Sequence, residues 1–281
     1  AQVEGIDYGG YGVASPVART ESFFILFSLV AQFKLHTCLI DIAKAFFHGD
    51  IGDKKVFVKL PPGYRQGVYA EYGADTVWQL HKAVYGLKQS GFAYYQHIKT
   101  DMKANGYTPL KADCCVFLRI VKAPPGAHLS DFARTHGGYE IMIIALWVDD
   151  NKIAYSAPHM LDHFRKFLRK CGYDFRDYGE WKYSLGLDIS YSRSGGRLLL
   201  SSKSYLSAFF KALPFKCTPP HLTPAPTGAR PKREDCVEGS LSENKFWWSE
   251  HFRRCLGAMS HIQNWTFRPE NICPRSVTTT V

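Results

Sequence analysis

Three aspartates stand where their carboxylates could bind metal ions together. Asp41 ends one apolar stretch of the chain, and Asp149 and Asp150 directly follow another. Nucleotidyl transfer needs two divalent cations, one to activate the attacking hydroxyl and one to hold the triphosphate and its leaving group. Hard cations prefer oxygen ligands, which carboxylates supply. The sequence therefore predicts a catalytic metal site formed by Asp41, Asp149 and Asp150, whose carboxylates repel one another until metal binds.

Each of these aspartates also has an ordinary interpretation. An Asp-Asp pair is common in surface turns, and Asp41 could equally cap a helix. The surrounding elements decide between the two. Residues 35–42 are typical of a short interior strand that ends in Asp41. Residues 141–148 form a strongly apolar strand, and a strand resumes at 153–155, which predicts a hairpin with Asp149 and Asp150 at its tip. If the two strands are neighbours in one sheet, the three carboxylates meet.

The remaining segments indicate a mixed α/β chain without internal repeats. The apolar spacing predicts helices at 20–33, from Phe92 through Tyr95, Ile98 and Met102 to an end at Asn105-Gly106, at 158–171 and at 205–213. Alternating residues predict a hairpin of 54–60 with 77–81, a strand at 116–120, and a second hairpin of 185–191 with 197–201. Turns or irregular connections are expected at 61–63, 122–138 and 194–196, a Pro-rich linker at 214–231, and a helical tail from 246.

Composition restricts the function classes. Apolar residues make up 46% of the 281 residues and aromatics 15%, which supports a large core and excludes a disordered tail. Lys and Arg number 35 against 25 Asp and Glu, a net charge of +10, which fits a solvated basic surface or a polyanionic partner. The eight cysteines form no Cys-x-x-Cys pair, so no zinc signature is present and reduced thiols are expected. The most apolar stretch, Phe23 to Val30, is far shorter than the roughly 20 residues that span a bilayer, and no targeting signal opens the chain.

Several sequence blocks, in order along the chain, carry a family resemblance. Residues 40–50 (IDIAKAFFHGD) resemble the first catalytic block of copia-type LTR-retrotransposon reverse transcriptases, and residues 147–150 (WVDD) resemble their Tyr-Val-Asp-Asp block. Further similar blocks are residues 2–19, 60–64 (LPPGY), 84–90 (VYGLKQS), 178–187 (YGE to LGL), 200–205 and 223–224. The resemblance covers nearly the whole chain, and the set is specific where one four-residue match would be weak.

The resemblance implies roles residue by residue. Asp41, Asp149 and Asp150 would be the catalytic carboxylates, and Asp41, Ile42, Asp149 and Asp150 would lie at the metal ions, Mg²⁺ or alternatively Mn²⁺. Phe46 would be the ring that excludes a 2′-hydroxyl and so selects deoxynucleotides; it could otherwise be a core aromatic.

Other positions would contact nucleotide or primer. Lys44 and Ala45 would offer backbone N–H groups to the triphosphate. Gln89 would contact the incoming nucleotide, or would be a surface amide. Leu185 and Gly186 would hold the primer end, although a plain hairpin turn would read the same way.

The implied fold is a right-hand polymerase of the α/β (α+β) class. Residues 1–192 would be incomplete fingers with the palm, and 193–281 a partial thumb, the linker and the start of a connection towards a ribonuclease H domain. The helix with Lys203, Tyr205, Phe209, Phe210 and Lys211 suits a thumb helix along a duplex groove, or simply a solvated amphipathic helix.

The implied function is RNA-directed DNA polymerisation. The expected partners are an RNA or DNA template with its primer, deoxynucleoside triphosphates and a homo- or heterodimeric partner, with no membrane. The expected location is the cytoplasm, in a virus-like particle, or the nucleus. The alternative is a catalytically inert nucleic-acid-binding remnant of a retrotransposon; a structural subunit of an active enzyme is a third option.

Departures from the family pattern bear on activity. Trp147 replaces the usual Tyr, Gly91-Phe92 a Pro-Arg pair, and Asn151-Lys152 two usually apolar residues. The family also places a basic fingers hairpin upstream of the position where this sequence opens. Since cations of that kind stabilise phosphoryl transfer, the expectation is that this fragment polymerises poorly or not at all by itself.

Overall fold

The computed structural model describes residues 14–52, 55–59 and 76–212. These residues belong to two compact units. The first runs to Trp181 and includes Tyr191–Leu198, and the second contains Lys182–Ser190 and the residues from Leu199 onward. The described fold is mixed α/β, and its paired strands run antiparallel, as the predicted α+β class requires. Among the described residues, no helix is both long and apolar enough to cross a membrane.

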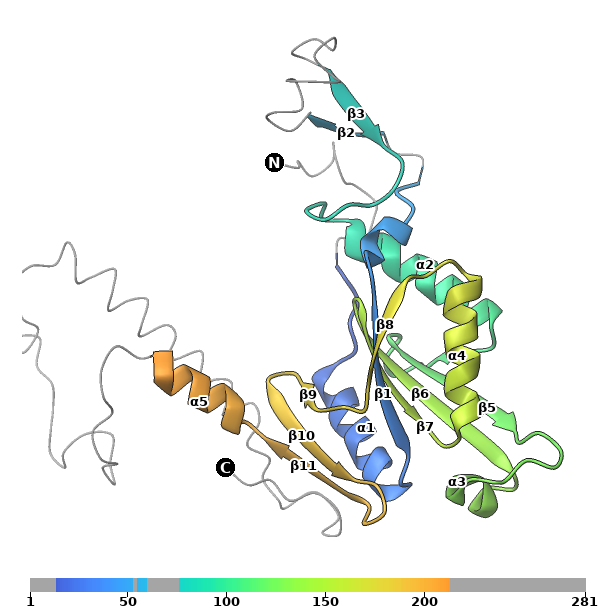
Figure 1. Ribbon diagram of the computed structural model, residues 1–281. Helices are drawn as coiled ribbons and strands as arrows, with labels where there is room; N and C mark the ends of the chain where they lie inside the picture. Colours follow the sequence, from blue (N-terminus) through green and yellow to red (C-terminus); the bar gives the residue numbers. More distant parts are fainter. Residues whose placement is uncertain (1–13, 53–54, 60–75, 213–281) are drawn as a thin grey trace, which may run out of the picture. The chain divides into compact units, whose positions relative to one another are not determined.

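A six-stranded sheet is the framework of the first unit, in the order β4-β5-β6-β7-β1-β8 (Figure 1). Its strands are β1 (His36–Ile42), β4 (Thr108–Pro109), β5 (Val116–Lys122), β6 (Tyr139–Trp147), β7 (Asp150–Tyr155) and β8 (Phe175–Gly179). β6 and β7 are buried over most of their length. Strands covered on both faces need apolar residues on both, which explains the near-continuous apolar run of β6.

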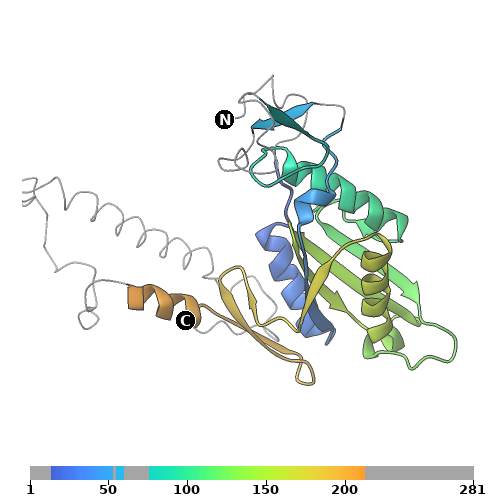
Figure 2. The same cartoon turned by 45° about the horizontal axis from the view of Figure 1, so that its top comes forward.

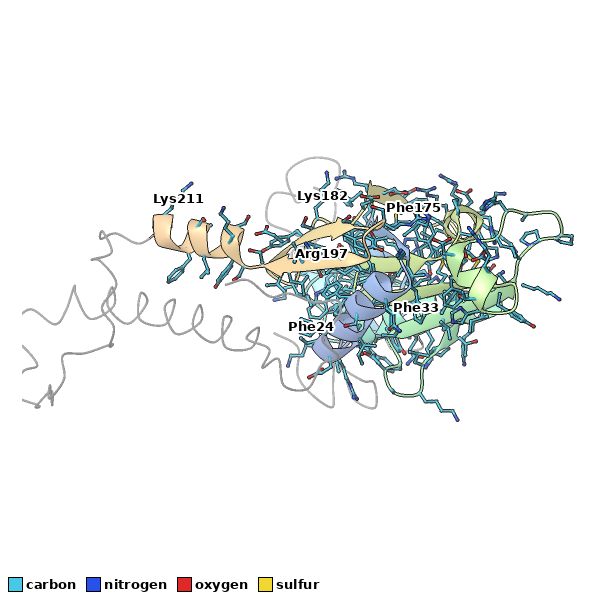
Figure 3. The ribbon with its side chains drawn as sticks, turned by 90° about the horizontal axis from the view of Figure 1, so that it is seen from below. Phe24, Phe33, Phe175, Lys182, Arg197 and Lys211 are labelled. Carbon is cyan, nitrogen blue, oxygen red and sulfur yellow. The ribbon has the colours of Figure 1, made fainter. Side chains whose placement is uncertain are left out.

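Helices cover both faces of this sheet (Figures 1 and 2). The first unit contains α1 (Thr20–Gln32), the 3₁₀ helix η1 (Ala45–His48), α2 (Ser90–Ala104), α3 (Asp131–Thr135) and α4 (Pro158–Lys170). α1 packs through Phe23 against Trp147 of β6, with ring centroids 5.9 Å apart. α4 has a proline in its first turn, a position where proline favours the start of a helix. The apolar stripe of α4 is buried. Phe24 lies on α1, and Phe33 directly follows the helix (Figure 3). The Phe33 ring lies 5.3 Å from that of Phe132 in α3.

Three smaller groups of elements complete the description. β2 (Val56–Lys59) and β3 (Val77–Leu80) form an antiparallel hairpin. β9 (Tyr183–Ser184), β10 (Leu187–Ser192) and β11 (Arg197–Ser201) belong to a three-stranded sheet. In the second unit, α5 (Lys203–Ala212) follows β11, and Asp188 accepts a hydrogen bond from the Ser204 N–H at 2.9 Å.

Most elements expected from the sequence are present, with three corrections. The segment 122–138, expected to be an irregular connection, contains the helix α3, whose Phe132 and Ala133 are buried. The buried face of α2 is made by Ser90, Gly91, Tyr94, Tyr95, Ile98 and Met102, so Phe92 is not part of it. The strand predicted from 185 begins at Leu187, which leaves Leu185 and Gly186 in a turn. The turn at 61–63, the linker at 214–231 and the tail from 246 lie outside the described residues.

Candidate active site

Asp41 and Asp150 lie directly opposite each other on neighbouring strands. β1 pairs with β7 in antiparallel register, and Asp41 is the partner of Asp150. Asp150 is also the partner of Trp147 across the β6–β7 hairpin. Residues directly opposite in an antiparallel pair have Cβ atoms about 4.5–5.5 Å apart. The condition set by the sequence, that the two strands be neighbours in one sheet, is therefore met.

Asp149 is tied to the same place by the tight turn between β6 and β7. Its carbonyl accepts a hydrogen bond from the Ile42 N–H at 2.9 Å, which joins the turn to the end of β1. The buried Asn151 side chain donates to the same carbonyl at 3.0 Å and to the Ile40 carbonyl at 3.2 Å. Val148 has φ of 56°, a left-handed conformation that is costly for a β-branched residue. The chain thus accepts strain in this turn and holds the backbone of Asp149 beside Asp41.

The electrostatics of the cluster show the cost of gathering these carboxylates. The pKa of Asp41 is raised above its ordinary value, first by burial and then by the negative charges of Asp149 and Asp150. Arg176, the partner of Asp41 on β8, acts in the opposite direction and partly offsets the repulsion. Such a cluster favours a bound cation, and its oxygen donors are those that Mg²⁺ and Mn²⁺ prefer.

An aromatic group adjoins the carboxylates. Phe46 lies in η1, five residues after Asp41, and its ring centroid is 4.8 Å from that of Tyr85. Lys44 precedes η1 in a left-handed conformation with φ of 55°, and Ala45 is buried. The backbone therefore reverses immediately after β1, which keeps the predicted nucleotide contacts of residues 44–46 close to Asp41 in the chain.

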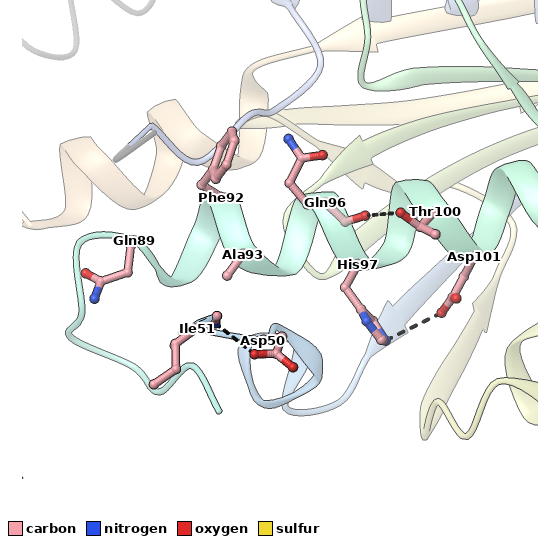
Figure 4. A pocket seen from close by; sticks show the side chains of 10 residues that line it. Asp50, Ile51, Gln89, Phe92, Ala93, Gln96, His97, Thr100 and Asp101 are labelled. Atoms are coloured by element: carbon pink, nitrogen blue, oxygen red, sulfur yellow. Dashed lines mark hydrogen bonds and ion pairs between the residues drawn. The ribbon is translucent and has the colours of Figure 1, made fainter. Parts of the chain in front are cut away.

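Gln89 occupies a different setting, in the wall of a cavity of about 340 Å³ beside α2 (Figure 4). The cavity is lined by one stripe of α2 and by the turn at Asp50–Gly52. In the same wall, the His97 Nε2 lies 3.5 Å from a carboxylate oxygen of Asp101, one helical turn away. The structure places Gln89 at the start of α2, buried, and its predicted contact with the incoming nucleotide stays a prediction.

Leu185 and Gly186 form the turn between β9 and β10 in the second unit. Both have left-handed backbones, with φ of 53° and 83°. Ser184 and Leu187 flank them as a cross-strand pair. They are therefore a tight hairpin turn, and their predicted role at the primer end stays a prediction.

Four neighbours of this site were not predicted from the sequence. Tyr85, Tyr94 and Arg176 were not singled out, because nothing in their local sequence shows that they lie near Asp41. Asn151 was noted only as a polar residue in an apolar strand, and that anomaly was a usable signal. Its side chain proves to fasten the turn that carries Asp149.

A second acidic group within the described residues has a structural role. The ligand atoms of Asp113, Cys114 and Cys115 lie within 4.8 Å of one another. However, the Asp113 carboxylate accepts hydrogen bonds from the Ser22 hydroxyl at 2.6 Å and from the N–H groups of Arg19 and Cys115. Its oxygens therefore anchor the start of α1 to the segment before β5.

Known proteins resemble this chain over most of its length. The sequence model of the family described as reverse transcriptase (RNA-dependent DNA polymerase) matches residues 1–225. The chain belongs to this family. The resemblance to copia-type reverse transcriptases is thereby confirmed, and the three aspartates lie within the matched region.

The curated relatives are transposon proteins. The retrovirus-related Pol polyprotein from transposon TNT 1-94 of Nicotiana tabacum is 26% identical over 223 residues, 79% of this chain and 15% of the relative. The putative transposon Ty5-1 protein of Saccharomyces cerevisiae is 29% identical over 168 residues, 60% of this chain and 47% of the relative. The Pol polyprotein from transposon RE1 of Arabidopsis thaliana is 25% identical over 205 residues, 73% of this chain and 12% of the relative. The chain thus spans less than half the length of these relatives.

Proposed function

We propose that this chain carries out template-directed addition of deoxynucleotides to a primer 3′-hydroxyl, on an RNA or DNA template, with two Mg²⁺ ions. One observation carries the proposal. Two strands more than a hundred residues apart in sequence bring Asp41 opposite Asp150 and hydrogen-bond Ile42 to Asp149. Membership in the reverse transcriptase family supports the same reaction.

The residues present fit the metal ions that this reaction needs. Asp41 and Asp149 would hold the ions, with Asp150 completing the negative charge and the carbonyl of Ile42 close by. Bound Mg²⁺ or Mn²⁺ would lower the pKa of the primer hydroxyl and neutralise the developing phosphate charge. The raised pKa of Asp41, due to burial and then to Asp149 and Asp150, shows that the protein itself leaves this charge incompletely balanced.

The surrounding residues would position the substrates. The N–H groups of Lys44 and Ala45 would meet the triphosphate, and Phe46 would stand under the sugar. Gln89 would contact the nucleotide from the start of α2. In the second unit, the turn of Leu185 and Gly186 would hold the primer end.

The proposal extends to the architecture. The six-stranded sheet would be the palm of a right-hand polymerase, the β2–β3 hairpin part of the fingers, and α5 part of the thumb. In this division residues 1–192 are fingers and palm, and 193–281 are a partial thumb with a connection. Expected partners are the template with its primer and the deoxynucleoside triphosphates.

Primer extension tests the proposal directly. The chain is incubated with a labelled primer on a defined RNA template, Mg²⁺ and all four deoxynucleotides, beside Asp149→Asn as the inactive control. We expect products that grow slowly with time, in keeping with a fragment that polymerises poorly by itself. In the variant the rate should be several orders of magnitude lower still, because removal of a ligand removes transition-state charge stabilisation. Tight binding of the primer–template without extension would instead show the inert nucleic-acid-binding remnant.

A further inference from the structure

Tyr85 is an aromatic residue held at the surface beside the candidate active site. Its side chain is 58% exposed, yet its ring centroid lies 4.8 Å from that of Phe46 and 5.8 Å from that of Phe47. Aromatic pairs at such separations contribute roughly 0.5–1.5 kcal/mol beyond the area that they bury. The exposed ring of Tyr85 therefore restrains the ring of Phe46.

The backbone around Tyr85 is fixed although the side chain is exposed. The carbonyl of Val84 accepts a hydrogen bond from the Ser90 hydroxyl at 2.6 Å, which ties the segment to the first turn of α2. The N–H of Ala83 donates to the Gly49 carbonyl at 3.0 Å, which ties it to the end of η1. The segment that carries Tyr85 is thus attached to η1, which contains Phe46, and to α2, which contains Tyr94.

A second ring contacts Phe46 from the interior. Tyr94 of α2 is 2% exposed, and its ring meets that of Phe46 edge-on at 6.4 Å. Phe46 therefore has a rigid, buried neighbour in Tyr94 and an exposed neighbour in Tyr85.

Both tyrosines are electrostatically coupled to the carboxylates. Burial is the first cause of the raised pKa of each phenol, and the negative charges of Asp149 and Asp41 follow. This coupling agrees with the ring contact to Phe46 in placing Tyr85 in the neighbourhood of Asp41 and Asp149.

We propose that Tyr85 is a specificity-determining positioning residue that braces Phe46 and thereby sets the preference for deoxynucleotides over ribonucleotides. The inference rests on the proposed function. A ring excludes a 2′-hydroxyl only while it keeps its rotamer, and a restraint on one side alone would let Phe46 turn away. Tyr85 supplies the restraint on the exposed side, and this needs its ring rather than its hydroxyl.

Four variants separate this role from a general effect on the fold. Tyr85→Leu removes the ring, Tyr85→Phe keeps it, and Phe46→Val shrinks the residue that is braced. Tyr139→Leu is the matched control, because Tyr139 is 47% exposed but begins β6 at the opposite end from the Asp149 turn. Circular dichroism and melting temperature confirm that each variant folds.

Two measurements report on each variant. The first is kcat/KM for a deoxynucleotide and for the matching ribonucleotide in single-nucleotide primer extension. The second is the equilibrium affinity of both nucleotides for the complex with a dideoxy-terminated primer on its template, which requires no turnover. Discrimination is the ratio of the deoxynucleotide value to the ribonucleotide value.

We expect Tyr85→Leu to lower discrimination on the order of tenfold, while Tyr85→Phe and Tyr139→Leu retain it. The double variant Tyr85→Leu/Phe46→Val should discriminate no worse than Phe46→Val alone, because a brace has no effect once the braced ring is gone.

Several outcomes would overturn the proposal. Discrimination that is unchanged in Tyr85→Leu, or equally lost in Tyr85→Phe or Tyr139→Leu, shows that the Tyr85 ring is not the brace. In these cases extension by the wild-type chain still upholds the proposed function. If the wild-type chain neither extends the primer nor binds nucleotide in the dideoxy complex, the proposed function fails and this inference fails with it.

Discussion

At the scale of single residues, the burial of Asp41 beside two other carboxylates has an electrostatic cost. Its folded-state pKa lies above the ordinary value, because of burial and then of Asp149 and Asp150. Folding therefore favours the protonated acid, and the stability associated with this group is lost as pH rises above about 4 and stays lost at neutral pH. A divalent cation would restore it by binding only the folded chain.

The first prediction follows from the raised pKa of Asp41, which means that its charged form destabilises the folded chain. At pH 7 in chelator, Asp41→Asn should melt at a higher temperature than the wild-type chain, by roughly 2–4 °C for each kcal/mol of repulsion relieved. Millimolar Mg²⁺ should then raise the melting temperature of the wild-type chain more than that of the variant. Asp131→Asn, at an exposed carboxylate of α3, is the control and should show neither effect. A variant that melts lower in chelator and gains equally from Mg²⁺ would contradict the assignment.

Phe46 gives the second prediction. Replacing it by Val should admit ribonucleotides and leave the use of deoxynucleotides nearly intact, since the change removes bulk and no charged contact. The ratio of the two kcat/KM values should fall by roughly 10–100-fold, the range associated with small changes in the bulk of a pocket. If single-nucleotide primer extension gives the same ratio for both proteins, Phe46 is a core aromatic without a role in sugar selection.

At the scale of elements, Asp113 joins helix and sheet across a long stretch of sequence. Its carboxylate accepts hydrogen bonds from Ser22 and from the N–H of Arg19 at the start of α1, and from the N–H of Cys115 ahead of β5. α1 in turn places Phe23 against Trp147, next to the strained turn. The position of the turn that carries Asp149 therefore depends in part on this anchor.

The third prediction concerns that anchor. Burial raises the pKa of Asp113, but the hydrogen bonds from Ser22, Arg19 and Cys115 outweigh it and leave the pKa below its ordinary value. Its stabilisation is thus present above pH 4 and is lost as pH falls through the folded-state pKa.

Urea denaturation at pH 7 and below pH 3 measures this effect. Asp113→Ala should lower the free energy of unfolding by about 2–3 kcal/mol at pH 7, because hydrogen bonds to a charged acceptor are lost, and by less at low pH. Ser22→Ala should cost a smaller part, about 1 kcal/mol. An Asp113→Ala penalty that is equal at both pH values would show that the charge of Asp113 is not involved.

Elements with a local signature could be predicted from the sequence, and elements defined by distant contacts could not. The apolar run of β6, the hairpin at Asp149 and the stripe of α4 are visible in the residue spacing. β8 was missed because it is an edge strand whose residues FRDYG are largely exposed and do not alternate. Arg176, which opposes Asp41, was missed with it. Tyr85 was not singled out for a related reason, since an exposed residue in a connection gives no periodic signal and its partner Phe46 is distant in sequence.

The strand pairing that brings the aspartates together also depends on contacts between residues distant in sequence. The sequence set the condition that β1 and the β6–β7 hairpin be neighbours, but the register of Asp41 with Asp150 comes from tertiary structure. A slip of one residue would turn the side chains to the opposite face, so the hydrogen bond from Ile42 to Asp149 matters as much as the acidic residues themselves.

At the scale of the whole molecule, charge is the dominant feature. The chain carries 35 Lys and Arg against 25 Asp and Glu, a net charge of +10, although its candidate site concentrates negative charge. A surplus of basic residues favours the binding of a polyanion such as nucleic acid. On α5, Lys203 and Lys211 are exposed, and Figure 3 shows the side chain of Lys211 projecting from the helix.

The fourth prediction is that binding to a primer–template duplex is electrostatic and largely independent of sequence. Each phosphate neutralised by a cationic side chain releases counterions, so the logarithm of the affinity falls linearly with the logarithm of salt concentration. For five neutralised phosphates the affinity should fall roughly 500-fold between 50 and 200 mM salt.

Fluorescence anisotropy with two duplexes of unrelated sequence should give the same slope for both. The double variant Lys203→Gln/Lys211→Gln should reduce the magnitude of this log–log slope by about 2, the contribution of two phosphate contacts, if α5 follows the duplex backbone. Lys122→Gln/Lys166→Gln, on β5 and α4, removes the same charge elsewhere and should leave the slope close to that of the wild-type chain. A flat salt dependence would exclude a groove that follows phosphates, and equal slopes for the two double variants would exclude α5 as its wall.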